Sequence, residues 1–587
     1  MKKIYILLTL LFIELVSVQA QYVIKSQEEL NDLKKLPLEK VYLSTSEKLV
    51  FAGEYLYYGF YCFNAQNSRF STISKVGYVA LVNAEKSYVF EQKLRLDKGL
   101  GQGEFFVPTS LPSGNYKLLG YTQWMKNGGL EQAFQLDVVI INPYTADQSS
   151  LLDSTPVSTV VPTEAISSEV DSATVGLVFS GKSLGKREKV SFSLKNYKGY
   201  LGNGVYTIKV KKKEDFQGTP TTNASVFSKR YLNVGKQLDL KVGDSLFLPE
   251  QRGELFFGSV TDAETNEPMS NQPVMVSLPG KEFVLKFATT DNNGNFYTYL
   301  RKDYKEAMAI VQAENDEDRL SIAVKTPSPL DVTDLTFGDF TMTAEMDEAI
   351  KQRSIRNQVE NQFFAQKPDS VLLGDPIDPF DGGSPQVFQL DDYTRFSTFQ
   401  ETLVEILNNA GYRNNPKGND YIRIAQDFEK ANEAYNDFPA IVVIDGVMIP
   451  NHETIKDFDA RTIKTIKMIR DQFQLANKDY QGLLSVETFD GNYFELHQRP
   501  NAIAAQVVKP LPAKNYYKQI YSPGAKDYER IPDYRTLLFW QPFVVVDGAG
   551  SDFEFFTSDV AGDYEVVVDG FTTYGKPIHF SKGFRVN

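Results

Sequence analysis

Short apolar runs, closed by turn residues about every 8–12 positions, dominate the first part of the chain and limit what it can fold into. Residues 55–63 form an aromatic run, and residues 76–82 and 88–96 are further apolar runs. The glycines of 99–103 and the Pro-Ser-Gly-Asn sequence at 112–115 supply turns. Successive side chains of a strand point to opposite faces, so this pattern predicts antiparallel strands packed as a β-sandwich.

The same alternation returns further along the chain. Val190, Phe192 and Leu194 alternate with polar residues, and so do Tyr206 and Ile208. Aromatic residues make up 13% of the chain, with 32 Tyr and 41 Phe against 2 Trp, a weighting that suits half-buried pleated surfaces. We therefore expect a mainly β protein with tandem immunoglobulin-like sandwiches.

Two stretches depart from the β pattern. Residues 344–366 form the best helical stretch of the chain and are expected to act as a connector. Residues 371–500 combine an amphipathic helix at 399–409, a buried strand at 440–444 and a short helix at 459–465. This mixture predicts a small α+β domain.

These patterns divide the chain into consecutive segments. Residues 145–174 are rich in Ser and Thr and predict a solvated linker. The expected order is a signal peptide (1–20), a β-sandwich (21–144), the linker (145–174), a second sandwich (175–252), a third (253–330), a helical connector (331–370), the α+β domain (371–500) and a C-terminal β domain (501–587).

The first 20 residues predict export. Lys2 and Lys3 precede an apolar run, and Val18-Gln19-Ala20 offers small residues for cleavage before Gln21. The cleavage point carries no cysteine, so we do not expect a lipoprotein. Because no later apolar stretch approaches the ~20 residues of a spanning helix, we expect a periplasmic or outer-membrane-associated protein without a transmembrane span of its own.

Composition narrows the function. The formal net charge of −13 argues against a nucleic-acid partner, because phosphate binding needs a basic face. Cys62 is the single cysteine and there are 3 histidines, so few cysteine and histidine side chains are available for catalysis or for binding a metal ion. We therefore expect no enzyme activity and no cofactor, and a protein that binds other proteins.

Several local motifs resemble chemical sites. Residues 176–183 match the phosphate-loop spacing and 181–185 match the nucleophile elbow, but both lie in β-type sequence rather than before a helix. His452-Glu453 begins like a zinc-protease motif, with Lys456 where the second histidine would stand. The loop carrying Asp375, Asp378 and Asp381 is a candidate calcium-binding site, and the alternative interpretation is a solvated acidic loop.

The β segments carry resemblances to known modules. Residues 41–54 and 111–125, with Pro-Ser-Gly-Asn-Tyr at 112–116, resemble macroglobulin-type domains of exported Bacteroidota proteins over 38–142, and 532–564 resembles them again. Residues 260–296, with Asp-Asn-Asn-Gly-Asn-Phe at 291–296, are similar to the non-catalytic carboxypeptidase-regulatory-like sandwich. Cys62 lacks the context of the macroglobulin thioester, so covalent trapping is not expected.

Residues 396–490 resemble the plug domain of TonB-dependent outer-membrane receptors. The matching pieces include 402–407, 421–424, 439–447 and 482–488. Ala425-Gln426 stands where the family has Arg-Gly. A receptor barrel of about 22 strands would need far more residues than follow, so we do not expect this chain to be the transporter itself.

Together the resemblances imply a binding or scaffold subunit that docks on an outer-membrane barrel complex for assembly, secretion or uptake. The alternative is a macroglobulin-like protease binder without a thioester, with 145–174 as bait. Binding would use edge-strand pairing and aromatic contact. The partner-binding residues that we predict are Tyr55, Tyr57, Tyr58 and Trp124.

Overall fold

The computed structural model describes residues 22–152, 174–179, 181–213, 216, 222–232, 238–301, 308–314, 319–372, 374, 377–380, 382–416, 418–426, 437–475, 478–521, 530–548 and 550–587. The expected signal peptide and most of the expected linker lie outside these residues. The described residues are mainly β, as the sequence predicts. They form two compact units, the first from within Met1–Gln251, Pro327–Leu373 and Pro510–Asn587, the second from within Arg252–Thr326 and Gly374–Lys509.

The first sandwich of the first unit confirms the β pattern of the N-terminal region. One sheet contains the strand formed by the aromatic run, and the other contains the predicted runs at 76–82 and 88–96. Their side chains form one large core. The strands are β2 (Glu39–Thr45), β4 (Tyr55–Asn64), β5 (Arg69–Phe70) and β8 (Leu100–Phe106), facing β3 (Leu49–Phe51), β10 (Phe134–Ile141), β9 (Gly114–Tyr121), β6 (Val76–Val82) and β7 (Tyr88–Arg95).

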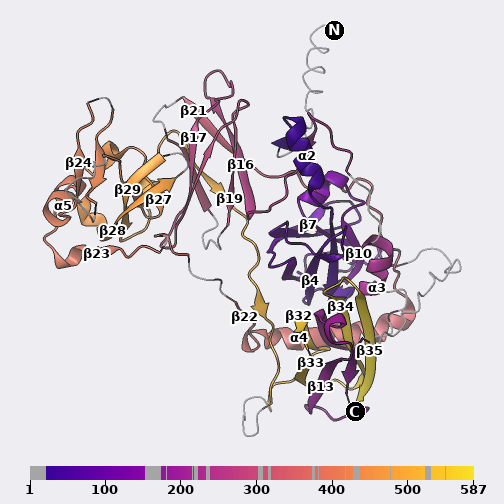
Figure 1. Ribbon diagram of the computed structural model, residues 1–587. Helices are drawn as coiled ribbons and strands as arrows, with labels where there is room; N and C mark the ends of the chain where they lie inside the picture. The colour runs from indigo at the N-terminus through magenta and orange to yellow at the C-terminus, as the bar shows by residue number, and fades with distance from the viewer. Residues whose placement is uncertain are drawn as a thin grey trace, which may run out of the picture. The chain divides into compact units, whose positions relative to one another are not determined.

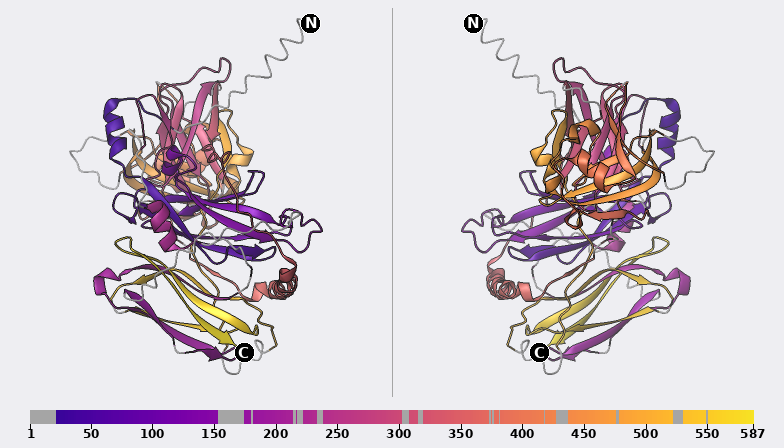
Figure 2. Two further views of the ribbon diagram at one scale, coloured as in Figure 1. Left: turned by 90° about the vertical axis from the view of Figure 1, so that its right-hand side faces the viewer. Right: turned by 90° about the vertical axis from the view of Figure 1, so that its left-hand side faces the viewer.

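The second sandwich combines segments from distant parts of the sequence (Figure 2). Strand β14 (Gly204–Lys212) lies between β32 (Leu537–Val546) and β34 (Gly562–Thr572), pairing antiparallel with both. The core includes the predicted inward residues Val190, Phe192 and Leu194. The remaining strands are β11 (Val175–Val178), β12 (Ser183–Leu184), β13 (Lys189–Asn196), β33 (Gly550–Phe556) and β35 (Pro577–Val586).

This arrangement corrects the expected division of the β regions. The sequence predicted separate domains at 175–252 and 501–587, whereas strands from both belong to the same two sheets. Phe227 and Leu232 pack into the core of the first sandwich instead. Periodicity indicates which face of a strand is buried, but strands pair through backbone groups that all residues share, so it does not reveal the neighbour.

A buried carboxylate joins the two sandwiches. Asp569 of β34 accepts hydrogen bonds from the hydroxyls of Tyr42 and Ser44 in β2 and from the Ala224 backbone N–H at 2.9 Å. The His579 Nδ1 atom lies 3.0 Å from its carboxylate. Burial alone would raise the pKa of Asp569, but the hydrogen bond and charge of His579 and the bonds from Tyr42 and Ala224 lower it to about 2.

The second unit begins with a third sandwich (Figure 1). The expected turn at 291–296 is present, with Asp291 N–H donating to Asn295 O at 2.8 Å and Gly294 at φ +71°. Strand β30 (Ala502–Gln506), from the region expected to open the C-terminal domain, pairs with β20 here. The other strands are β16 (Glu254–Asp262), β17 (Pro273–Leu278), β18 (Val284–Thr289), β19 (Asn295–Leu300), β20 (Met308–Ala313) and β21 (Leu320–Lys325).

The rest of the second unit is an α+β domain over its described residues between 377 and 496. Helix α5 (Phe399–Ile406) begins with a capping box in which Thr398 and Glu401 bond each other's backbone N–H. The predicted helix at 459–465 is a single 3₁₀ turn, Ala460–Thr462, and the strand begins at Ile463. The sheet order is β23 (Gln386–Gln389), β28 (Ile463–Leu475), β29 (Lys478–Thr488), β26 (Ile441–Ile444) and β27 (Val447–Met448), beside a hairpin of β24 (Ala410–Arg413) and β25 (Tyr421–Ile424).

Replacing Asp569 tests the contact between the two sandwiches. Asp569→Asn leaves the buried partners of the carboxylate imperfectly matched, and we expect it to lower the free energy of unfolding by about 3 kcal/mol at neutral pH. Both tryptophans, Trp124 and Trp540, lie in the first unit, so their emission during urea unfolding reports on that unit. Asp563→Asn, at an exposed carboxylate on the same strand, is the control.

The pH dependence follows from the lowered pKa of Asp569. Its folded-state pKa of about 2 lies below the ordinary 3.8, so its contribution is complete above about pH 4 and is lost as the pH falls toward 2. We expect wild type to lose about 2 kcal/mol across this window and Asp569→Asn to lose less. Equal losses in the two proteins would contradict this assignment.

Candidate functional site

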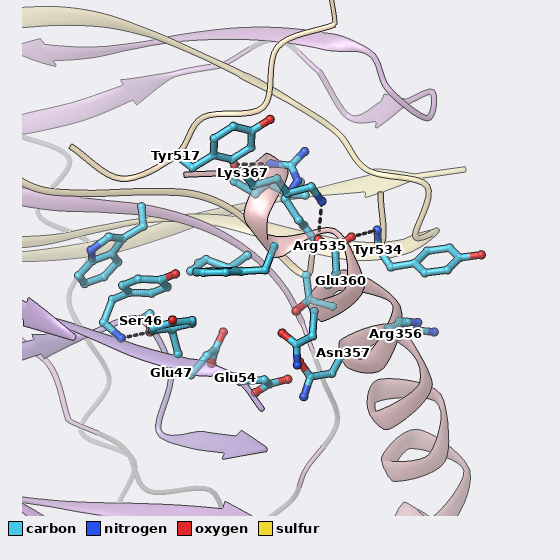
Figure 3. A pocket seen from close by; sticks show the side chains of 18 of the residues that line it. Ser46, Glu47, Glu54, Arg356, Asn357, Glu360, Lys367, Tyr517, Tyr534 and Arg535 are labelled. Atoms are coloured by element: carbon cyan, nitrogen blue, oxygen red, sulfur yellow. Dashed lines mark hydrogen bonds and ion pairs between the residues drawn. The ribbon is translucent and has the colours of Figure 1, made fainter. Parts of the chain in front are cut away.

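A cavity of about 200 Å³ lies within the first unit. It is bounded by the beginning of β4, by helix α4 (Asp347–Gln362) with the residues that follow it, and by residues 516–517 and 534–540 (Figure 3). The predicted helical stretch at 344–366 therefore does more than connect domains, because it forms one wall of the cavity.

Three polar side chains at a spacing of four hold α4 against the turn between β3 and β4. Arg353 donates to Leu49 O at 3.1 Å, Asn357 to Ala52 O at 2.8 Å, and Asn361 to Gly53 O at 2.9 Å. Residues four apart share one helix face. Strand β3 is at the edge of its sheet, so among the described residues no neighbouring strand supplies N–H groups to the backbone carbonyls on its outer side. The three side chains of α4 supply hydrogen bonds instead, at β3 and in the turn that follows it.

An ion pair strengthens the same contact. Arg353 Nε lies 2.9 Å from Glu54 Oε1, and Arg353 Nη2 lies 2.8 Å from Glu54 Oε2. The side chains are 7% and 18% exposed, so water screens this pair less than a surface pair. The guanidinium also lies 4.7 Å from the centre of the Phe51 ring. Helix α4 is thus held mainly by polar contacts.

Gly53 is required at the turn for two reasons. Its φ is +90°, which L side chains rarely adopt, and a Cβ there would lie 2.9 Å from the Nδ2 atoms of both Asn357 and Asn361. Any larger residue would push these amides away from the carbonyls that they bind.

Aromatic rings line the cavity. The rings of Tyr55 and Phe364 stack at 5.2 Å with an interplanar angle of 12°. Tyr57 lies 6.3 Å from Trp540 at 28° and 4.9 Å from Tyr516 at 74°. Burial, and then the carboxylates of Asp369 and Glu104, raise the pKa of Tyr57 well above 10, so its hydroxyl stays protonated.

The structure places the predicted partner-binding residues in two groups. Tyr55 and Tyr57 line the cavity. Tyr58 and Trp124 are 0% and 1% exposed. The Tyr58 hydroxyl donates to Gln92, and Trp124 Nε1 donates to Pro37 O at 3.1 Å. Both of these side chains therefore pack inside the first unit.

The other motifs have structural roles where they are described. Of the calcium candidates, Asp375 and Asp381 lie outside the described residues, and the Asp378 carboxylate accepts from the N–H groups of Phe380 and Gly382 at 2.9 and 2.6 Å. His452 is buried, accepts from the Ile422 N–H at 2.9 Å, and has its pKa lowered to about 4 by burial. Ser183 lies in β12.

The described residues contain no group of three or more His, Cys, Asp or Glu side chains placed to hold a metal ion. Among them, no helix is both long and apolar enough to cross a membrane.

Sequence reasoning missed much of the cavity. The spacing of Arg353, Asn357 and Asn361 was a usable signal, because a helix without an apolar stripe must be held by polar contacts or stay solvated. Phe364 and Trp540 gave no such signal, since they come together with Tyr55 and Tyr57 only in the folded unit.

Comparisons with known proteins give distant likenesses only. No family model matches the chain, and no curated protein matches it. Salmonella alpha-2-macroglobulin reacted with methylamine is similar at 8% identity and a TM-score of 0.23, over 97% of this chain and 40% of that one. Trypsin-activated alpha-2-macroglobulin from Escherichia coli is similar at 8% identity and a TM-score of 0.22, over 94% of this chain and 41% of that one.

A third likeness is to the Escherichia coli adhesin FdeC, at 12% identity and a TM-score of 0.13, over 46% of this chain and 58% of that one. The chain spans about two fifths of the length of the Salmonella macroglobulin. TM-scores of this size carry no argument about what this chain does.

Replacing Gly53 tests how α4 is held. We expect Gly53→Ala to lower the free energy of unfolding of the first unit by about 2–3 kcal/mol, because it combines an unfavourable φ with a clash against the two asparagines. Gly243→Ala is the matched control, since Gly243 of the same unit has nearly the same φ, +92°, but nothing within 4 Å of the added Cβ. It should cost about 1 kcal/mol. Urea unfolding detected by tryptophan emission measures both losses. Equal losses of unfolding free energy in the two variants would show that α4 does not constrain Gly53.

Proposed function

We propose that this chain is an exported, non-enzymatic binding or scaffold subunit of the cell envelope that docks on an outer-membrane barrel complex for assembly, secretion or uptake. The leader-like residues 1–20 support export. The resemblance of residues 396–490 to receptor plug domains supports a barrel partner, by analogy. The single observation that carries the proposal is the open edge of the sheet in the α+β domain.

One edge of that sheet is covered within the second unit. At β27, Met448 N–H donates to Ser277 Oγ at 3.2 Å, and Gln312 Nε2 donates to Met448 O at 2.6 Å. Met275 and Phe283 of the third sandwich share a buried cluster with Ile441 and other residues of the domain. The domain and the third sandwich therefore dock as one body, which favours binding to the outside of a barrel complex over insertion of the domain alone.

The opposite edge is open. Strand β23 pairs only with β28 among the described residues. Gln386, Val387 and Gln389 are exposed on it, and it contains neither a charged residue nor proline. Natural sheets protect exposed edges with these residue types, and their absence from β23 itself leaves its backbone groups free to accept a strand from another protein. Main-chain hydrogen bonds would supply affinity, and Val387 would supply an apolar contact.

A charge at this edge should block the interaction. We expect Val387→Lys to reduce recovery of a barrel protein several-fold when the tagged protein is purified from gently solubilised envelopes, because a charged lysine on an edge strand disfavours pairing with another strand. Val404→Lys is the matched control, since Val404 is exposed on helix α5 of the same domain.

Mass spectrometry of the purified protein should also find Gln21 at its N-terminus. Recovery of no barrel protein with the wild-type chain would contradict the proposed partner. Equal recovery with the two variants would contradict β23 as the docking edge while leaving the partner in place.

A further inference from the structure

The cavity in the first unit has a chemistry that the proposed function does not use. Its charged lining residues balance in number, four acidic against four basic: Glu47, Glu54, Glu360 and Asp369 against Arg353, Arg356, Lys367 and Arg535. Arg353 pairs with Glu54 at 2.8 Å, and Lys367 pairs with Glu360. Glu47 pairs with Lys211 at 2.8 Å. A cavity whose charges balance in number has no net charge to attract an anion or a cation, which favours an uncharged ligand.

The size and walls of the cavity set the shape of the ligand. Its volume of about 200 Å³ lies below the range of roughly 300–1,000 Å³ typical of pockets for drug-sized molecules, so it accommodates one small ring. Tyr55, Tyr57, Phe364 and Trp540 supply ring surfaces from three separate segments of the chain. Flat aromatic surfaces favour a ligand with a flat apolar face.

The polar groups of the cavity set its hydrogen bonding. Each ionised carboxylate offers about four acceptor sites, and the pairs described above leave some of those of Glu47 and Glu360 unused. The Tyr57 hydroxyl is a donor. Trp540 is 5% exposed and its Nε1 atom is buried, so Trp540 contributes ring surface to the cavity rather than a donor. The ligand must therefore both donate and accept, as hydroxyl groups do.

These three properties describe one chemical class. We propose that the cavity binds an uncharged saccharide ring, with its C–H face on the aromatic side chains of Tyr55, Tyr57 and Phe364 and its hydroxyl groups bonded to the carboxylates and to the Tyr57 hydroxyl. Helix α4 orders the site, since Asn357 and Glu360 line the cavity from it (Figure 3). This site lies in the first unit and is independent of docking at β23 in the second.

The test uses the full mature chain and two neutral sugars, D-glucose and N-acetyl-D-glucosamine. Binding is followed by isothermal titration calorimetry and by tryptophan emission, to which Trp540 contributes from the cavity wall. We expect saturable binding at millimolar concentration to at least one of them. Sorbitol, which has hydroxyls but no ring, and glucuronate, which carries a charge, should bind more weakly.

Variants connect the binding to the cavity. Phe364→Ala, at a side chain that is 44% exposed, should weaken binding roughly tenfold by removing one ring surface. Tyr57→Phe removes only a hydroxyl and should weaken it several-fold. Tyr200→Ala, at a side chain that is 83% exposed in the second sandwich, is the control and should bind as wild type does.

Three results would overturn the proposal. They are no saturable binding of either sugar, binding that Phe364→Ala and Tyr57→Phe leave unchanged, and equal or tighter binding of sorbitol or glucuronate. Unfolding midpoints measured for each variant separate loss of the site from loss of the fold. The purification from envelopes with Val387→Lys tests a different surface, so a result that contradicts one proposal does not contradict the other.

Discussion

The pairing of β14 with β32 and β34 is the constraint on which the rest of the structure depends. Strand β14 ends at Lys212 and β32 begins at Leu537, so the chain between them must leave the second sandwich and return to it. The entropic cost of closing such a loop grows only slowly with its length. A long excursion is therefore tolerated, and it contains α4, the whole second unit and part of the packing on the first sandwich.

Within the first unit, polar contacts fix how the pieces fit. Asp569 joins the two sandwiches through Tyr42, Ser44 and Ala224, and Arg353 with two asparagines holds α4 at the β3–β4 turn. Directional bonds to buried groups are costly when left unsatisfied, so they disfavour alternative arrangements more than they add stability. Of the residues that make these contacts, Arg353, Asn357 and Asn361 also line the cavity.

The two candidate surfaces lie in different units and have different physics. The β23 edge offers backbone groups and an apolar side chain to another strand, whereas the cavity offers rings and a balanced set of charges to a small ligand. A protein of this kind can bind a macromolecule with one unit and a small ligand with the other without sharing residues between the two sites.

The sequence by itself determined the local structure. Apolar runs between turns indicated the strands around residues 55–63 and 76–82, alternation indicated the strand around 190–194, the best helical stretch indicated α4, and the changed pattern after residue 371 indicated the α+β domain. Tyr55 and Tyr57 were identified, together with Tyr58, as residues of an aromatic run. These features depend on residues close in sequence, whose periodicity states which side is buried.

Only the tertiary structure decided which strands are neighbours. It merged the two β regions expected at 175–252 and 501–587, buried Tyr58 and Trp124, and brought Phe364 and Trp540 to the cavity. Among the described residues, it also left β23 with one partner strand only while covering β27. The physical reason is that strand pairing uses backbone groups common to every residue, so the choice of partner is made by the packing of whole sheets.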